Sequence, residues 1–252
     1  MFDTLKIWLH QGKQYIPDVT TTDVPGIFRG RPEISDVQVD ETALVDLCPM
    51  DAIKSNPLRI DLGRCSFCGE CAFACPSKIR FTKDYKMSHN DRNGLIISAG
   101  DNSSIVLDET KVRAEIRRLF GRSLKLRQVS AGGDGSCEME LNATSNVNFD
   151  IGRFGIDFVA SPRHADGIVV TGPISENMAA PLADAYRAVP EPKIVILAGT
   201  DAISGGLFAD SAAIDRSVLN DWHIDLYVPG NPVHPLTFVN GVLSLIGRKR
   251  KR

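Results

Sequence analysis

Cys65-Ser66-Phe67-Cys68-Gly69-Glu70-Cys71-Ala72-Phe73-Ala74-Cys75-Pro76 is the stretch that decides the fold of the first half of this chain. Its spacing is C-x2-C-x2-C-x3-C-P, in which a tight loop brings three thiolates onto three irons of an iron–sulfur cube. Zinc is the competing interpretation, but zinc sites usually pair two distant C-x2-C knuckles or use histidine, and a trailing proline is not part of that pattern. The spacing therefore predicts a [4Fe–4S] cluster on Cys65, Cys68 and Cys71.

The fourth ligand of this cluster is expected from outside the run. In two-cluster ferredoxins the last cysteine of each run ligates the other cluster, so Cys48, which is followed by Pro49, is the predicted fourth ligand. Cys75 would then be a leftover thiol, buried as a small apolar residue. The alternative is that Cys75 completes the site and all four cysteines of the run hold one cluster.

A second cluster is not expected in this half of the chain. Counting back from Cys48 by the same spacing gives Gln38, Glu41 and Leu44 where three more thiolates would stand. None of these side chains is a normal ligand of a cluster of this type. The sequence therefore predicts that the first of the two cluster positions has been lost.

Composition and charge narrow the class of protein. The chain has 252 residues, of which 43% are apolar and 24% charged, with a net charge of −2. This is the balance of a soluble globular protein of one or two domains, and a net charge near zero does not favour nucleic acid as a partner. No stretch approaches the roughly 18 apolar residues that span a bilayer, and the start of the chain lacks the layout of a signal peptide.

The distribution of cysteines indicates the compartment. Five of the six cysteines fall between Cys48 and Cys75, and in a reducing compartment such clustering indicates metal ligation over disulfides. We therefore expect a cytoplasmic protein that binds a cofactor.

Patterning divides the chain into two expected domains. Residues 1–95 would form a ferredoxin-like iron–sulfur domain with an N-terminal strap, and residues 96–252 would form an α/β domain with a basic tail. The tail, Arg248–Arg252, is either solvated or a contact for anionic lipid or an acidic partner. An amphipathic helix is expected over residues 3–12 and an extended strap over residues 16–36.

The second domain shows short apolar strands that alternate with helices. Strands are expected at residues 124–129, 156–160, 167–171, 193–198 and 225–228, and helices at 181–189 and 235–246. Such alternation predicts a mainly parallel sheet, where loops at the carboxyl ends of the strands build the site.

Both halves resemble known subunits. Residues 16–82 resemble the ferredoxin-like subunit of group 4 [NiFe] hydrogenases and of complex I, through the segment 26–33 and the cysteine runs. Residues 124–247 resemble the small subunit of those hydrogenases and the complex I 20 kDa-type subunit. The second resemblance is carried by residues 133–140, 153–157, 161–166, 171–173, 205–206 and 227–230. It implies a flavodoxin-like sheet and a fusion of two subunits that are usually separate.

The resemblance also implies where a proximal cluster would be bound. The small subunit holds this [4Fe–4S] cluster through four cysteines, and the matching positions here are Asp134, Cys137, Asp201 and Asn231. An iron–sulfur cluster prefers soft thiolate ligands, whereas these positions offer one thiolate, two carboxylates and an amide. A second cluster is therefore not expected in the C-terminal domain. Asp134, Cys137 and Asp201 could instead bind a harder metal, or the loop is vestigial.

The function implied by the resemblance is electron transfer. The chain would be a non-catalytic subunit of a membrane-associated, hydrogenase-like or complex I-like oxidoreductase, peripheral on the cytoplasmic face of the membrane. Its expected partners are a hydrogenase large subunit or complex I 49 kDa-like subunit and the membrane subunits. The alternative is a scaffold that docks such a partner after loss of the proximal cluster. No phosphate loop, H-E-x-x-H motif or Ser-His-Asp context of an independent enzyme is present.

Overall fold

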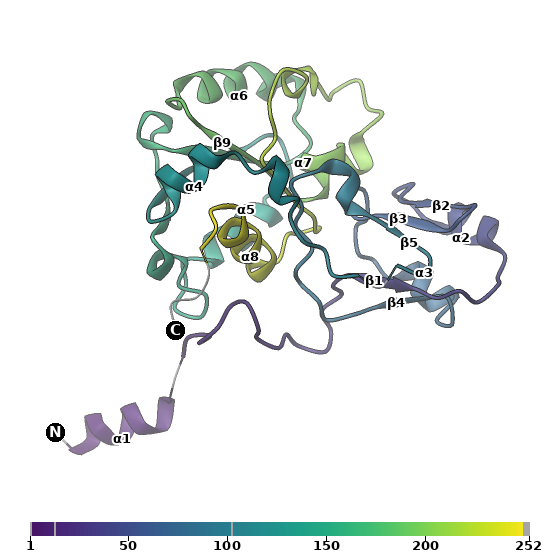
Figure 1. Cartoon of the computed structure of the whole chain (residues 1–252), viewed down its shortest axis with the longest axis horizontal. Helices are drawn as coiled ribbons and strands as arrows, with labels where there is room; N and C mark the ends of the chain where they lie inside the picture. The colour runs from purple at the N-terminus through teal and green to yellow at the C-terminus, as the bar shows by residue number, and fades with distance from the viewer. Residues whose placement is uncertain (1, 13, 102, 249–252) are drawn as a thin grey trace.

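A five-stranded parallel sheet forms the C-terminal domain of the computed structural model, which describes residues 2–12, 14–101 and 103–248 (Figure 1). The strands are β6 (Leu124–Ser130), β7 (Ile156–Phe158), β8 (Gly167–Thr171), β9 (Ile194–Ala198) and β10 (Leu226–Val228). Their order in space is β10-β9-β8-β6-β7, and all pairs are parallel. In chain order this is the 2-1-3-4-5 arrangement of flavodoxin-like folds, so the predicted fold class is confirmed.

Helices cover both faces of this sheet. They are α4 (Ala114–Phe120), α5 (Ser136–Ala143), α6 (Glu176–Ala188), α7 (Thr200–Ser204) and α8 (Pro235–Leu245). Along β9, Ile194 and Ile196 pack in one apolar cluster with α4, α5 and α8, whereas Val195 and Leu197 pack in another with α6 and α7. This alternation is the two-residue period of a strand. Because both faces are covered, β8 and β9 are buried along their whole length.

The N-terminal domain is built from two small antiparallel sheets. One pairs β1 (Pro32–Ile34) with β4 (Ile79–Phe81), and the other has the order β2 (Ile53–Lys54), β3 (Arg59–Asp61), β5 (Ile96–Ser98). Two short helices, α2 (Glu41–Leu47) and α3 (Glu70–Ala74), lie beside them. The second sheet extends to Ser98, three residues beyond the boundary expected at residue 95.

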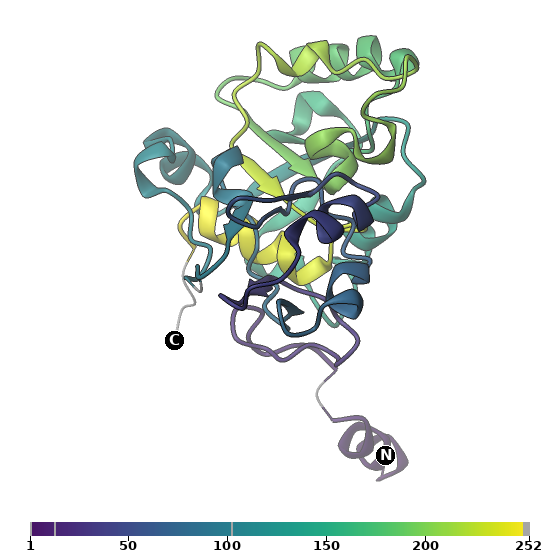
Figure 2. The same cartoon turned by 90° about the vertical axis from the view of Figure 1, so that its right-hand side faces the viewer.

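The two domains share apolar packing. One core cluster contains Ile53 and Ile60 of the N-terminal domain together with Ile168 and Leu197 of the parallel sheet. A β-bridge between His89 and Tyr227 adds a main-chain contact between the connecting segment and the sheet. Figure 2, the view from the cysteine side, shows the small domain lying against the larger one.

The predicted strands agree with the structure to within two residues at each end, but one predicted helix begins in the wrong place. The helix expected at residues 181–189 starts five residues earlier, at Glu176, and contains Pro181. A proline removes one main-chain donor, yet the helix continues because Ala179 and Leu182 are buried against the sheet. Tertiary packing therefore outweighs the local signal.

The first helix, α1 (Phe2–Gln11), has no buried residue and projects from the body of the molecule (Figure 1). It agrees with the helix expected over residues 3–12. Among the residues that the structure describes, no helix combines the length and the apolar character needed to cross a membrane. Residues 249–252 of the expected basic tail lie outside the described residues.

We predict that Phe238 is a main contributor to the stability of the larger domain. Its side chain is fully buried on α8 and stacks on Phe158 with ring centroids 6.0 Å apart. Phe238→Ala should lower the free energy of unfolding by about 3–5 kcal/mol, because apolar contact is lost and a cavity remains. Urea denaturation measures this. The control Phe73→Ala, at a side chain that is 73% exposed, should change the value by less than about 0.5 kcal/mol; equal losses in the two variants would contradict the prediction.

Candidate metal centre

Four cysteines of the N-terminal domain line one cavity. Cys48, Cys65, Cys68 and Cys71 border it, and its walls include Met50, Ile53, Ile60 and Phe81. Cys65 is buried, Cys48 and Cys71 are half-buried, and Cys68 is exposed. The structure thus brings together the four predicted ligands, although three of them follow one another in the chain and Cys48 comes from the end of α2.

The loop that carries three of these cysteines is fixed by Asp61 at the end of β3. The main-chain amide of Cys65 donates to the carbonyl of Asp61 at 2.9 Å, and the Asp61 carboxylate accepts from Gly63 N at 2.9 Å. Arg92 clamps that carboxylate with two hydrogen bonds of 2.7 and 2.6 Å. A bidentate pair of this kind fixes orientation as well as adding attraction, so Arg92 holds the start of the loop.

Two residues of the loop adopt left-handed backbone conformations. Gly69 has φ +88° and Phe67 has φ +56°. Glycine reaches this region at no steric cost, whereas a bulky residue such as Phe does so rarely and at functional sites. The turn they make directs Cys65, Cys68 and Cys71 towards the same cavity.

Main-chain donors point at two of the sulfurs. Phe67 N lies 3.3 Å from Cys65 Sγ, and Ala52 N lies 3.4 Å from Cys48 Sγ. Donors of this kind favour the thiolate form, which is the form that binds iron. The set of donor groups, four sulfurs with apolar walls and inward amides, fits the cluster predicted from the spacing.

Burial affects the protonation of the same thiols. Removal from water raises the pKa of Cys65 to about 12 and that of Cys71 to about 11, and the neighbouring cysteines add to both shifts. Without metal these groups are therefore neutral thiols at physiological pH. Metal binding requires thiolates and so releases their protons.

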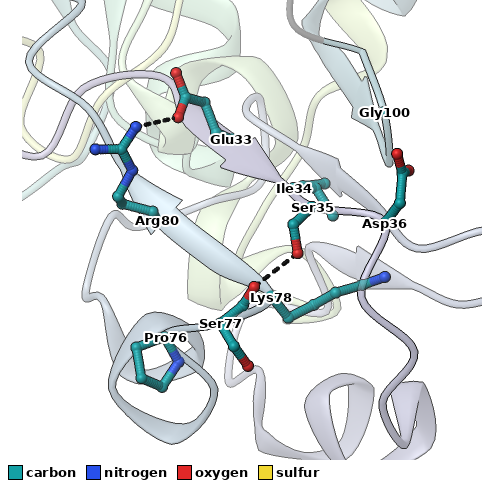
Figure 3. A pocket seen from close by; sticks show the side chains of 9 residues that line it. All are labelled: Glu33, Ile34, Ser35, Asp36, Pro76, Ser77, Lys78, Arg80 and Gly100. Atoms are coloured by element: carbon teal, nitrogen blue, oxygen red, sulfur yellow. Dashed lines mark hydrogen bonds and ion pairs between the residues drawn. The ribbon is translucent and has the colours of Figure 1, made fainter.

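The expectation for Cys75 needs a correction. It was expected to be buried, but it is half-buried and its Sγ lies 3.6 Å from Ser77 Oγ. Cys75 follows the last residue of α3 and does not border the four-cysteine cavity. The next two residues, Pro76 and Ser77, line a separate pocket beside β1 and β4 (Figure 3). Its thiol packs against the edge of the apolar core and has the Ser77 hydroxyl beside it, so it is only partly covered.

Two of the positions where the sequence predicts a lost first cluster, Leu44 and Glu41, make ordinary structural contacts. Leu44 is buried in the core, and Glu41 Oε1 lies 3.8 Å from the ammonium of Lys78. The same ammonium, which is almost fully buried, donates to Val37 O at 2.8 Å. A buried cation needs such partners.

In the C-terminal domain, Asp134, Cys137, Asp201 and Asn231 follow β6, β9 and β10 at the carboxyl edge of the sheet. Asp134 Oδ1 accepts from Ser136 N and Oγ at 2.9 and 2.6 Å, so it supports the start of α5. Burial, and next the charge of Asp134, raise the pKa of Asp201. Asn231 borders the same crevice as Cys68.

Cys137 is a buried thiol rather than an open ligand. Burial raises its pKa to about 12, although the amide of Val233 donates to its sulfur. Gly199 is required beside it, because a Cβ there would stand 2.6 Å from the Cys137 sulfur. Within residues 2–12, 14–101 and 103–248, no three His, Cys, Asp or Glu side chains are close enough to hold one metal ion. In a cube each thiolate binds a different iron, so its sulfurs stand further apart than those around one ion.

Sequence patterns gave no signal for three residues that support the cavity. Thr200 Oγ1 donates to the carbonyl of Cys65 at 2.8 Å, and Arg29 donates to the carbonyl of Phe67 at 3.1 Å. Arg216 caps the end of α7 by donating to the carbonyls of Ala202 and Ile203 at 2.7 and 3.0 Å. The partners of Thr200 and Arg29 lie 135 and 38 residues away and those of Arg216 lie 14 and 13 residues away, so no local spacing reveals these contacts.

The flavodoxin-like sheet, joined to a small domain with a four-cysteine cavity, defines an iron–sulfur protein of the oxidoreductase-subunit class. Residues 58–80 match the 4Fe-4S binding domain, and residues 135–245 match the family described as NADH ubiquinone oxidoreductase, 20 Kd subunit. The first match contains Cys65, Cys68, Cys71 and Cys75 but not Cys48.

Curated relatives agree with these matches. The chain is 34% identical to formate hydrogenlyase subunit 7 of Escherichia coli over 62% of this chain and 60% of that protein. It is 33% identical to "Probable membrane-bound hydrogenase subunit mbhJ" of Pyrococcus furiosus, over 55% of this chain and 83% of that protein. It is 38% identical to an NADH-quinone oxidoreductase subunit of Geotalea daltonii, over 45% of this chain and 68% of that protein. The chain belongs to the family of the NADH ubiquinone oxidoreductase 20 kDa subunit, and the predicted resemblance is confirmed.

We predict that Cys48, not Cys75, completes the cluster. After anaerobic reconstitution, Cys48→Ser should lower the iron content and weaken or alter the EPR signal of the reduced protein, because Cys48 borders the cavity. Cys75→Ser is the matched control and should leave both unchanged, since its thiol faces Ser77. Loss of iron and signal in Cys75→Ser alone would assign the fourth ligand to Cys75.

A second prediction concerns the metal-free protein at high pH. Burial raises the pKa of Cys65 from 9.0 to about 12, so the native state keeps a proton that the unfolded chain releases above pH 9.0. The contribution of Cys65 to the free energy of unfolding is therefore complete below pH 9.0. It declines as the pH rises from 9.0 towards about 12. Denaturation midpoints measured against pH should fall in this range, and Cys65→Ser should reduce the slope. An identical slope in the variant would show that Cys65 does not contribute.

Proposed function

We propose that this chain transfers single electrons as a non-catalytic subunit of a membrane-associated, hydrogenase-like or complex I-like oxidoreductase. In this proposal Cys48, Cys65, Cys68 and Cys71 hold one [4Fe–4S] cluster. The observation that carries it is the shared cavity, which these four side chains border and Cys75 does not. Relatives named as hydrogenase and NADH-quinone oxidoreductase subunits support the reaction class.

When bound, the cluster supplies one-electron transfer at a potential set by its surroundings. The protein's own contribution is to bind and tune it. Met50, Ile53 and Ile60 line the cavity with apolar surface and limit the access of water. Inward amides at Cys48 and Cys65 stabilise negative charge on the sulfurs, and the exposed Cys68 leaves one edge open towards the surface.

We further propose that the C-terminal domain holds no second cluster. Asp134 is engaged by Ser136 in the start of α5, and Cys137 is packed against Gly199. Asn231 supplies an amide in place of a thiolate. A cube needs soft ligands, and Cys137 is the one cysteine that this edge of the sheet offers among the described residues.

The proposed partners are a hydrogenase large subunit-like or 49 kDa-like subunit and the membrane subunits of the same complex, on its cytoplasmic side. The name of the Pyrococcus relative supports association with a membrane-bound complex. The chain spans 60% of the length of formate hydrogenlyase subunit 7.

The number of clusters can be measured on the full chain. Reconstituted protein should contain about four irons, the content of one cube. The fourfold variant Cys48→Ser/Cys65→Ser/Cys68→Ser/Cys71→Ser should contain none, whereas Cys137→Ser should keep about four. About eight irons in the parent chain, falling to about four in either variant, would show a second cluster. An iron-free parent chain would leave the scaffold function as the better explanation.

A further inference from the structure

A groove lies at the end of the larger domain where α4 and the last turn of α8 meet. Its volume is about 1070 Å³, and its lining includes Arg117–Leu119, Gly121, Arg122, residues 105–107, residues 243–244 and residues 246–248, together with Thr20 and Lys86. We call it the α4/α8 groove. Figure 1 shows α4 on the side of the parallel sheet away from α2 and α3, so the groove is distinct from the cysteine cavity.

The charge of the groove is strongly one-sided. Among the described residues that border it, five side chains are cationic and one, Glu109, carries a carboxylate. The cations are Lys86, Arg117, Arg118, Arg122 and Arg248. Arg117 forms an ion pair with Glu109. Across the described part of the chain, Arg118, Arg122 and Lys86 form no ion pair with a carboxylate. The groove therefore has uncompensated positive charge.

The same groove offers apolar surface between these cations. Val106 is 68% exposed and Leu119 is 48% exposed, and both border the groove together with the buried Leu243 and Ile246. Exposed apolar side chains that gather in a concave, charged surface indicate a binding site rather than a solvated face. A ligand that satisfies both features must be anionic at one end and apolar at the other.

Arg248 fixes this end of the chain on the groove. Its amide donates to Leu243 O at 2.8 Å, and its guanidinium donates to Arg122 O at 2.6 Å. One wall of the groove is therefore tied to the connection between α4 and β6. In sequence, Lys249, Arg250, Lys251 and Arg252 follow directly, and basic side chains close to a membrane surface are attracted to its acidic phospholipids.

We propose that the α4/α8 groove binds an anionic phospholipid of a membrane surface, with its phosphate at Arg118 and Arg122 and part of its acyl chain on Val106 and Leu119. A guanidinium presents paired N–H donors that match phosphate oxygens. An acidic protein segment could use the same charges. The lipid is favoured because apolar side chains stand among the cations and because the charge run continues in the sequence. This inference adds a membrane contact made by the chain itself, beyond electron transfer.

The test uses the reconstituted full chain and vesicle flotation. We expect binding to vesicles that mix phosphatidylglycerol with phosphatidylcholine, little binding to pure phosphatidylcholine, and loss of binding as salt is raised. Arg118→Glu/Arg122→Glu should weaken binding at least about tenfold, since each cation near an anionic surface contributes roughly one tenfold step or somewhat less. The matched control Arg59→Glu/Arg163→Glu makes the same change in net charge at exposed positions outside the groove and should bind within about twofold of the parent.

Three results would overturn the proposal. The first is equal binding to anionic and neutral vesicles. The second is binding that survives Arg118→Glu/Arg122→Glu but is lost with Trp8→Glu, which would place the membrane contact on the exposed helix α1. The third is binding of inorganic phosphate or polyglutamate at the groove without vesicle binding, which would indicate a free anion or an acidic protein. Iron content and the EPR signal, recorded on the same samples, report separately on the electron-transfer proposal.

Discussion

The position of the cysteine loop is constrained by one buried hydrogen bond between the two domains, from Thr200 Oγ1 to the carbonyl of Cys65. Thr200 has no exposed surface and opens α7 just after β9, so this bond ties the carboxyl edge of the parallel sheet to the cysteine loop. Ile203, one turn further along, packs so closely on Gly63 that a Cβ there would stand 2.8 Å from it. A shift of the sheet edge would therefore move Cys65, and the geometry of the four-cysteine cavity is a property of both domains together.

At the positions where the sequence predicts that cluster ligands have been replaced, the side chains make contacts that stabilise the fold. Leu44 fills core volume, the Lys78 ammonium is satisfied by Glu41 and a carbonyl, and Asp134 supports the start of α5. These contacts avoid two free-energy penalties. A void at Leu44 would lose van der Waals contacts, and an unpaired charge on the buried Lys78 would be strongly destabilising. The domain can thus keep its structure at these positions without a cofactor.

How much of this could be predicted from the sequence depends on how local each feature is. The spacing of Cys65, Cys68 and Cys71 and the alternation of apolar residues in β8 and β9 are local, and they predicted the cavity and the sheet. The start of α6 was missed because burial of Ala179 and Leu182 outweighs Pro181. Thr200 and Arg29 were missed because their partners lie 135 and 38 residues away. The exposure of Cys75 likewise follows from where β1 and β4 place its neighbours, which no spacing encodes.

The edge of the proposed cluster at Cys68 determines where an electron would leave the chain. Cys68 and Asn231 border one crevice, so the open edge faces the loop that follows β10. Cys137, the remaining thiol on that edge of the sheet, is enclosed by Gly199 and receives a hydrogen bond from Val233, and burial keeps it a neutral thiol. Under the proposed function, Cys137 therefore supplies no thiolate that would continue a relay along this edge of the sheet. Under the same proposal, the partner that accepts the electron would approach this crevice, where the half-buried Phe28 and the exposed Ile27 offer it an apolar contact.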